Sequence, residues 1–206
     1  MRLLELFSGT GSVRKAVGHL FEEIVSIDIL QKFNPTECCD ILNWDYQKYP
    51  PGYFHCIWAS PPCTEFSILK QNTKMTTNLH IADAIVQRTI EIIEYYKPDK
   101  WFIENPQTGI LKYREYMLGI PFYVFDYCRF SNWGYKKRTC IWTNVEFQSK
   151  LCLGAGKCPN MEGKYHKVSF GGQGRPKPHT YKQVAAGDTA YRIPSQLIVE
   201  LFQSPV

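Results

Sequence analysis

Hydrophobic positions along the chain fall into short β-branched or aromatic runs separated by longer segments with helical spacing. Runs that predict strands cover residues 2–7, 24–29, 54–59, 100–103, 122–128 and 138–143. Apolar residues three and four positions apart predict helices that begin near residue 13, run from 81 to near 97, and close the chain at 193–202. The first thirty residues predict a βαβ unit, which implies a parallel sheet with a right-handed crossover. The pattern therefore predicts one open α/β domain, mostly parallel, with 122–128 and 138–143 forming an antiparallel edge.

Composition agrees with one folded domain. The chain has 206 residues, of which 44% are hydrophobic and 15% aromatic, enough for a sizeable core. No run approaches the roughly 18 apolar residues that a membrane span needs, and Glu5 interrupts the first apolar stretch, unlike a signal peptide. We therefore expect a protein that is not secreted, whose eight cysteines are thiols or ligands and not disulfides.

The net charge of +5 is concentrated in one segment. Residues 150–182 contain seven basic residues and one acid, Glu162, while the rest of the chain has 17 basic and 18 acidic residues. The same segment holds six of the 14 glycines. A loop-rich basic insert of this kind is a plausible contact surface for a polyanion, and the alternative is a solvated surface loop.

The first predicted strand ends in a glycine-containing turn, Phe7-Ser8-Gly9-Thr10-Gly11. Glycines let the backbone approach a ligand at the N-terminus of the next helix, and Asp28 at the end of the second strand can accept hydrogen bonds from ribose hydroxyls. Arg14 replaces the third glycine of a dinucleotide fingerprint, which favours a different adenosine-bearing ligand. The alternative is that the glycines serve turn geometry alone.

Two further motifs follow strands in the same way. Pro61-Pro62-Cys63 comes after the strand at 54–59, and Glu104-Asn105-Pro106 comes after the strand at 100–103. Because the carboxyl ends of parallel strands meet at one edge of a sheet, we expect a nucleophilic thiol and a carboxyl group in one crevice. Taken singly, each residue has a structural alternative: the cysteine as a small buried hydrophobe and the glutamate as a turn cap. Three strand-end motifs at one edge favour a site.

In their order along the chain these motifs resemble those of the DNA (cytosine-5)-methyltransferase family. Residues 61–67 match the family's Pro-Pro-Cys-x-x-Phe-Ser, and 104–106 match its Glu-Asn-Pro. The resemblance spans Met1 to about Asn144, with a looser match at the C-terminus. It implies the Rossmann-like fold of S-adenosylmethionine-dependent methyltransferases.

The resemblance also implies S-adenosylmethionine as the cofactor. Residues 6–11 are similar to the family's cofactor loop, Asp28-Ile29 to the acid and adenine-contacting residue after the second strand, and Asp40-Ile41 to the motif whose Asp meets the adenine. The cofactor-binding residues implied in this way are Phe7, Ser8, Gly9, Thr10, Gly11, Asp28, Ile29, Asp40, Ile41 and Pro61.

The implied reaction is methylation of carbon 5 of cytosine in DNA. Carbon 5 is a poor nucleophile, so a thiolate from Cys63 would add to carbon 6 and make carbon 5 enamine-like. A carboxyl group, here Glu104, would hydrogen-bond or protonate N3, and a cytosine in a duplex would have to be flipped out. Two alternatives remain: the same chemistry on RNA, and a nucleic-acid-binding protein that keeps the fold without catalysis.

The resemblance loosens after the fourth strand. Arg138 occupies the place of the last arginine in the family's Gln-x-Arg-x-Arg motif and is implied to meet the target base; Lys136 and Gly134 replace the first arginine and the glutamine. A lysine lacks the bidentate fork of arginine, and the alternative is a basic turn that opens an edge strand. Nucleic-acid contacts are predicted for basic residues here and in the insert: Lys136, Lys137, Lys164, Lys167, Arg175 and Lys177.

We expect residues 1–206 to form a single methyltransferase domain. Within it, 146–189 would act as a reduced target recognition region, and 190–206 would return to the core as a helix, with Ala190-Tyr191-Arg192-Ile193-Pro194 in place of the family's Gly-Asn-x-Val-Pro. So compact a form resembles proteins of phages and large DNA viruses. It implies short or degenerate specificity, or a helper protein that supplies it, and a location in the cytoplasm, nucleus or a viral factory.

The insert also carries two cysteines and a histidine. Five residues separate Cys152 from Cys158, more than the usual two to four of a zinc site, so no metal is predicted; zinc at Cys152, Cys158 and His166 is the less favoured alternative. Cys128 and Cys140 are predicted to lie inside strands.

Overall fold

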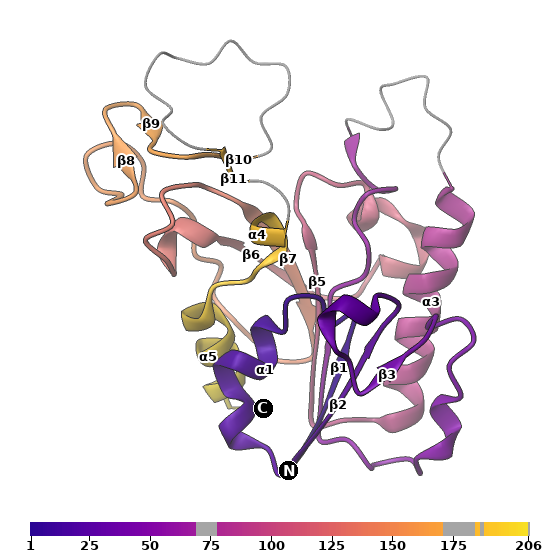
Figure 1. Ribbon diagram of the computed structural model, residues 1–206. Helices are drawn as coiled ribbons and strands as arrows, with labels where there is room; N and C mark the ends of the chain where they lie inside the picture. The colour runs from indigo at the N-terminus through magenta and orange to yellow at the C-terminus, as the bar shows by residue number, and fades with distance from the viewer. Residues whose placement is uncertain (69–77, 171–183, 186–187, 206) are drawn as a thin grey trace.

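The computed structural model describes residues 1–68, 78–170, 184–185 and 188–205. Its centre is a seven-stranded sheet (Figure 1). In spatial order the strands are β3 (Glu37–Cys38), β2 (Glu23–Asp28), β1 (Arg2–Leu6), β4 (Cys56–Ala59), β5 (Lys100–Pro106), β7 (Arg138–Thr143) and β6 (Phe122–Asp126).

The strand directions confirm the predicted sheet. The five strands from β3 to β5 are parallel to their neighbours, and β7 is antiparallel to both β5 and β6. A parallel pair needs a crossover connection, and here α1 (Ser12–Val17) joins β1 to β2 while α3 (Leu79–Tyr96) lies between β4 and β5 in the sequence. An antiparallel β7 brings its first residues beside the last residues of β5.

Helices cover both faces of the sheet, so the strands are apolar on both sides. On one face α1 and the C-terminal helix α5 (Ser195–Gln203) pack over Leu3, Trp58 and Phe102. On the other face α3 packs over Leu4 and Ile57. The alternation along β1 follows from the two-residue period of a strand.

One strand prediction is wrong at its end. The structure ends β6 at Asp126, and Cys128 lies in the 3-10 turn η6 (Tyr127–Arg129), not in a strand. The strand stops where the Phe130 amide donates back to the Tyr127 carbonyl at 3.0 Å, which closes a turn in place of a further ladder bond. Cys140, by contrast, is buried in β7 as predicted.

Shorter elements complete the described part of the chain. The two-residue strand β3 and the 3-10 turns carry no periodicity that could predict them. Those turns are η1 (Gly18–Leu20), η2 (Gln31–Phe33), η3 (Tyr46–Lys48), η4 (Leu111–Tyr113) and η5 (Glu115–Met117). Near the C-terminus a short helix, α4 (Asp188–Tyr191), precedes α5. Within the described residues no helix has the length and apolar character needed to cross a bilayer.

The insert forms small pieces of sheet outside the main one. The strands β8 (Met161–Glu162) and β9 (Tyr165–His166) make an antiparallel hairpin, and β10 (Ser169–Phe170) pairs in parallel with β11 (Val184–Ala185). In Figure 1 this part lies beyond the β6–β7 side of the sheet, at the same end as the carboxyl ends of β1 and β4. The insert thus stands beside the edge where the predicted site motifs meet.

Candidate active site

The loops after β4 and β5 are held together by a buried hydrogen bond. Ala59 and Ile103 pair near the ends of these neighbouring parallel strands. Beyond them, Asn105 donates from Nδ2 to the carbonyl oxygen of Pro61 at 2.9 Å, and the Asn105 side chain is fully buried. The motifs that carry Cys63 and Glu104 are therefore fixed to each other, as their strand-end positions predicted.

The Glu104 carboxylate is buried and surrounded by donors. Its Oε1 accepts a hydrogen bond from the Tyr127 hydroxyl at 3.1 Å and another from the Thr139 hydroxyl, and the Lys137 ammonium lies 3.7 Å away. Thr139 also donates to the Asn105 carbonyl at 3.0 Å. All of these contacts reach Oε1, which leaves Oε2 as the oxygen available to a substrate.

Sequence reasoning missed Tyr127 and Thr139 as members of this site. A signal for Thr139 existed, because side chains two residues apart in a strand share a face and Thr139 is two residues after Lys137. Tyr127 had none, since it reaches Glu104 only through the turn that ends β6.

Cys63 is partly exposed and its thiol is held in the protonated form. Burial of the sulfur and the nearby Glu104 carboxylate raise the pKa of Cys63, and Lys137 opposes them more weakly. A carboxylate, a lysine and a thiol thus interact electrostatically at one edge of the sheet. A thiol whose pKa is raised must lose its proton before it can act as a nucleophile.

The structure separates the two neighbouring cations at the start of β7. Lys137, predicted to bind nucleic acid, is only 7% exposed; it lies beside Glu104, with its ammonium 5.0 Å from the centre of the Tyr127 ring. Arg138, predicted to be catalytic, points the other way and binds both oxygens of Asp126 at 2.8 Å. The alternation of side chains along a strand explains the exchange: the cation beside the carboxylate is Lys137.

Asp126 is the anchor of Arg138. Burial alone would raise its pKa, but the Arg138 guanidinium, the Cys152 amide and the Lys136 ammonium together lower the pKa of Asp126 below its ordinary value. The Cys152 amide donates to Oδ2 at 2.7 Å, and Lys136, which is exposed, lies 3.9 Å away. Arg138 therefore connects β7 and β6 to the insert.

The glycine-containing turn after β1 has left-handed backbone at three positions. Phe7, Gly9 and Gly11 have φ angles of 58°, 45° and 68°, in the left-handed region that disfavours a side chain. A phenylalanine held there costs of order 1–3 kcal/mol, which is typical of functional loops. Ser8 is buried, and Thr10 is partly exposed at the turn.

Residues after β2 and β3 complete this edge. Asp28 accepts from the amides of Gly9 and Leu30, both at 2.8 Å, so it fixes the turn and keeps further lone pairs. Ile29, predicted to contact the adenine, is 65% exposed. Asp40 is partly exposed, whereas Ile41 is buried in the core, so only its backbone is available to a ligand.

A cavity of about 310 Å³ lies on the α1 side of the glycine turn. Its lining brings Thr10, Ser12 and Lys15 together with Trp133 and with Ile193 of the C-terminal segment. The Ile193 amide donates to the Ser12 hydroxyl at 3.1 Å, so the C-terminal segment returns to the glycine turn. Cys63 and Glu104 do not line this cavity, which therefore adjoins the glycine-containing turn and not these two side chains.

A buried carboxylate, Glu5, lies beneath the same turn. It accepts hydrogen bonds from the amides of Val13 and Arg14 at the start of α1, and one of its oxygens, Oε2, has no partner. Burial raises the pKa of Glu5 to about 7, although Arg14 and the two amides lower it. The protonated form is therefore favoured by folding.

Replacing Glu5 with Gln should stabilise the protein at alkaline pH. A carboxyl whose pKa rises from 4.5 to about 7 on folding loses stability as the pH rises through that window. The full penalty, present above the folded pKa, is of order 3 kcal/mol. Urea unfolding of wild type and Glu5→Gln at pH 5 and pH 8 measures it; the advantage of the variant should appear at pH 8 and shrink at pH 5. An equal difference at both pH values would contradict this.

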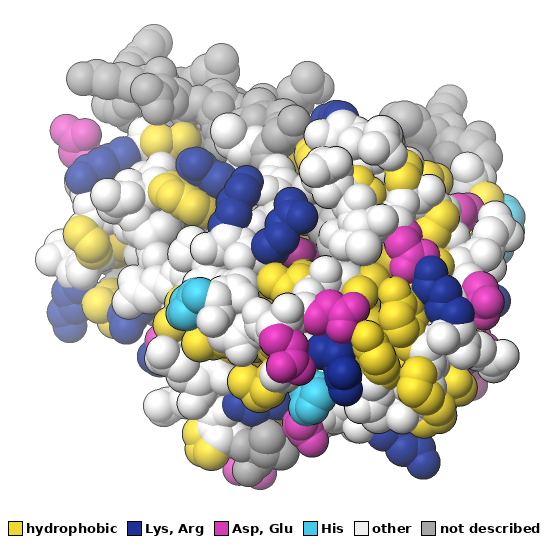
Figure 2. Space-filling model, turned by 60° about the horizontal axis from the view of Figure 1, so that its bottom comes forward, with side chains coloured by type: hydrophobic (Ala, Val, Ile, Leu, Met, Phe, Trp, Pro, Cys, Tyr) yellow, Lys and Arg dark blue, Asp and Glu magenta, His cyan; other side chains and the backbone are white. Residues whose placement is uncertain are grey.

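The insert presents basic side chains where nucleic acid was predicted to bind. Lys164 and Lys167 are exposed on and beside the β8–β9 hairpin. Figure 2 shows several Lys and Arg side chains on the upper left part of this face, next to the residues drawn in grey. Arg175 and Lys177, also predicted as contacts, lie outside the described residues.

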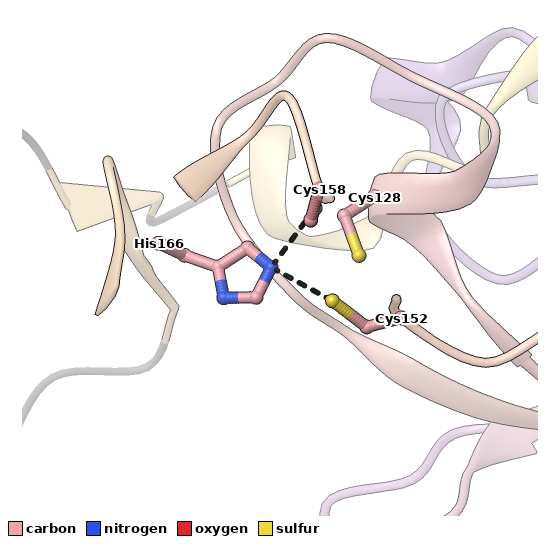
Figure 3. A group of neighbouring side chains, drawn as sticks. All are labelled: Cys128, Cys152, Cys158 and His166. Carbon is pink, nitrogen blue, oxygen red and sulfur yellow. Dashed lines mark hydrogen bonds between the residues drawn. The ribbon is translucent and has the colours of Figure 1, made fainter. Parts of the chain in front are cut away.

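The three residues of the less favoured zinc alternative do come together, and a fourth candidate ligand joins them. Cys152, Cys158 and His166 cluster beside Cys128, which the sequence had placed inside a strand (Figure 3). The turn at η6 carries Cys128 toward the insert, and no spacing rule could have linked it to Cys152, because 23 residues and the strand β7 separate them.

Known proteins resemble this chain along most of its length. A family model described as C-5 cytosine-specific DNA methylase matches residues 1–118, which include Cys63 and Glu104 but not Arg138 or the insert. Over 98% of this chain and 98% of its own length, a protein of Frog virus 3 (isolate Goorha) is 39% identical; its name is "Probable DNA (cytosine-5)-methyltransferase".

A solved structure shares the fold. The Entamoeba histolytica methyltransferase EhMeth aligns with a TM-score of 0.51 at 13% identity, over 73% of this chain and 57% of its own. At that identity the likeness confirms the expected methyltransferase fold and nothing finer. The chain spans just over half the length of this solved structure.

Proposed function

The chain belongs to the C-5 cytosine-specific DNA methylase family, whose activity is S-adenosylmethionine-dependent methylation of cytosine in DNA, and we propose that Cys63 and Glu104 carry that reaction here. The observation that supports this assignment is the buried Asn105–Pro61 hydrogen bond at 2.9 Å, which joins the loop of the thiol to the loop of the carboxylate. Two strand ends then present a nucleophile and an acid to one substrate.

Cys63 acts as the nucleophile. Its thiolate adds to carbon 6 of cytosine, a sulfur–carbon bond forms, and the electron pair of the 5,6 double bond moves into the ring toward N3. Glu104, as a protonated carboxyl, donates a hydrogen bond from Oε2 to N3 and stabilises that charge. After methylation a base removes the carbon 5 proton, the released electron pair re-forms the 5,6 double bond, and the Cys63 sulfur leaves carbon 6 as a thiolate that can then take up a proton.

Tyr127, Thr139 and Lys137 hold Glu104 for this role. Their three contacts on Oε1 fix the carboxyl plane, and a buried carboxyl with fixed orientation loses no freedom when the base arrives. Lys137 also balances the negative charge that accumulates when the Cys63 thiolate forms beside Glu104. Arg138 then serves the structure of the insert, through Asp126.

The strand-end residues fit S-adenosylmethionine. When bound, this cofactor supplies an electrophilic methyl group on a sulfonium. The positive φ angles of Phe7, Gly9 and Gly11 open the backbone to it, the exposed Ile29 suits an adenine face, and Asp28 and Asp40 are placed for polar groups. The cavity lined by Thr10, Ser12 and Lys15 adjoins this turn and could receive the carboxylate-bearing end of the cofactor.

The insert serves as a reduced target recognition region within a single domain. Lys164, Lys167 and Lys136 are exposed and positively charged, so they suit phosphate contacts, which position DNA but do not read its sequence. So short a region supports a short or degenerate target, or one supplied by a helper protein. Strong salt dependence of binding should accompany such contacts.

Methyl transfer with a tritiated cofactor tests the proposal. Duplex DNA should acquire label that co-migrates with 5-methylcytosine after nucleoside digestion, and RNA of the same sequence should acquire less. Bisulfite sequencing of DNA from cells that co-express the protein should give the sequence context. Label only in RNA would move the substrate to RNA, and calorimetry without cofactor binding would instead indicate a binding protein that keeps the fold.

A further inference from the structure

A cluster of three thiols and one imidazole lies outside the proposed active site. Cys128 follows β6, Cys152 and Cys158 lie in the loop after β7, and His166 ends β9, yet the side chains point toward one another (Figure 3). The ligand atoms of all four lie within 4.8 Å of one another. Cys128 and Cys158 are buried, and the other two are partly exposed.

The distances match a tetrahedral metal site. The His166 Nε2 atom lies 3.6 Å from the Cys152 sulfur and 3.8 Å from the Cys158 sulfur. A tetrahedral zinc with Zn–S near 2.3 Å and Zn–N near 2.0 Å separates its sulfur and nitrogen ligands by about 3.6 Å and two sulfurs by about 3.8 Å. One ring nitrogen thus faces two sulfurs at the separation that a shared ion requires.

We propose that Cys128, Cys152, Cys158 and His166 bind one Zn²⁺ in a Cys3His site. All eight cysteines lie in the described part of the chain and are free thiols, so no disulfide competes for these three. Soft thiolates with one imidazole in tetrahedral array select zinc over magnesium or calcium, which prefer oxygen ligands. Four protein ligands close the coordination sphere, so the site is structural and not catalytic.

Backbone around the cluster is built to hold the ligands. The Cys152 amide donates to Asp126 at 2.7 Å, and the Gly154 amide points at the Cys152 sulfur at 3.4 Å. Asn160, which is buried, donates from Nδ2 to the carbonyl of Cys128 at 2.9 Å. Outer contacts of this kind orient metal ligands, and here they hold the backbone of Cys128 and Cys152.

Positive charge beside the cluster suits three thiolates. Zinc bound to three thiolates and a neutral imidazole carries a net charge of −1. Arg138 and Lys136, both paired with Asp126, lie next to it, and Arg138 interacts electrostatically with Cys128 and Cys152. Two cations around one carboxylate leave one net positive charge beside the metal site.

The segment around the cluster has only a small apolar core in its described part. Its strands β8 and β9 contain two residues each, and the large side chains of Leu151, Leu153 and Tyr165 are at least 44% exposed. Segments with so small a core commonly depend on a metal for their fold. The ion would tie the insert to the end of β6.

The metal would also hold two lysines in place for DNA binding, and this effect alone rests on the proposed function. Lys164 lies between β8 and β9, and Lys167 follows His166 directly. Loss of the metal would release these two lysines from their place beside the sheet. The metal site itself stands on the cluster geometry alone.

Metal content of the untagged protein, purified under reducing conditions and reconstituted with zinc sulfate, tests the site. Elemental mass spectrometry should find one zinc per chain in wild type and in Cys38→Ser, which removes an exposed thiol outside the cluster. Cys152→Ser and His166→Ala should lose most of it. Wild type without stoichiometric zinc, or variants that keep it, would overturn the proposal.

Cobalt titration of chelator-treated wild type keeps the test independent of whether the variants fold. Co²⁺ should give the intense visible bands and the sulfur-to-cobalt charge-transfer band of a tetrahedral thiolate site, with an endpoint of one ion per chain, and Zn²⁺ should abolish them. Weak bands of octahedral cobalt would overturn the proposal. Neither measurement involves methylation, so a failure here is distinct from a failure of the proposed function.

Discussion

Replacing Cys63 with Ser should abolish methylation of DNA while leaving the fold and cofactor binding intact. A serine hydroxyl is too weak a nucleophile to add to carbon 6 without a dedicated base, so the rate should fall by at least about 10³-fold. DNA containing 5-fluorocytosine should form a covalent complex with wild type, visible by denaturing electrophoresis, and none with Cys63→Ser. Calorimetry with S-adenosylmethionine should give the same affinity for both proteins.

Cys56→Ser is the matched control, because it makes the same atomic change in the buried thiol at the opposite end of β4. It should keep both activity and the covalent complex. The raised pKa of Cys63 adds a pH test: the thiolate fraction of the free enzyme increases with pH, so the alkylation rate of Cys63 by iodoacetamide should rise steadily on the alkaline side of neutrality. A covalent complex that survives Cys63→Ser would show that another group is the nucleophile.

Replacing Glu104 with Gln should lower the methylation rate by about 10²- to 10⁴-fold, the usual contribution of a positioned acid. The amide keeps the shape of the carboxyl and can still accept from Tyr127 and Thr139 at one oxygen, but it cannot give a proton to N3. Because the nucleophile is intact, the variant should bind the cofactor normally. Single-turnover kinetics, with enzyme in excess over DNA and a tritiated cofactor, would measure the chemical step directly.

Glu94→Gln, on an exposed position of α3, is the control for this change and should leave the rate unaltered. A Glu104→Gln enzyme with wild-type single-turnover rate would remove Glu104 from the reaction. An increase in KM alone, with kcat unchanged, would mean that Glu104 binds the base equally in the ground state and the transition state.

Local sequence was enough to predict six of the seven strands of the sheet and the two groups proposed for the reaction. Strand β7 was predicted at its observed bounds, Arg138–Thr143, because a β-branched and aromatic run between polar turns has few alternatives. Cys63 and Glu104 follow buried strands, and parallel strands place their carboxyl ends at one edge regardless of the distance between them in the chain. The motif order then identified the family.

Contacts between distant segments could not be predicted in this way. Whether Lys137 or Arg138 faces Glu104 depends on the register of β7 against β5, where Glu104 lies opposite Ile141. A shift of one residue would exchange the two side chains, and no local pattern sets that register. For the same reason Tyr127 entered the site only once the turn after β6 was known.

By itself, the sequence determined the fold class, the strand-end motifs and the two groups proposed for the chemistry, because these depend on local periodicity and on the rule that parallel strands end together. Tertiary structure alone decided that Lys137 supports the carboxylate, that Arg138 anchors the insert through Asp126, and that Cys128 joins Cys152, Cys158 and His166. Each of these depends on how far a side chain reaches across folded segments, and that distance is set by packing and strand register, not by spacing along the chain.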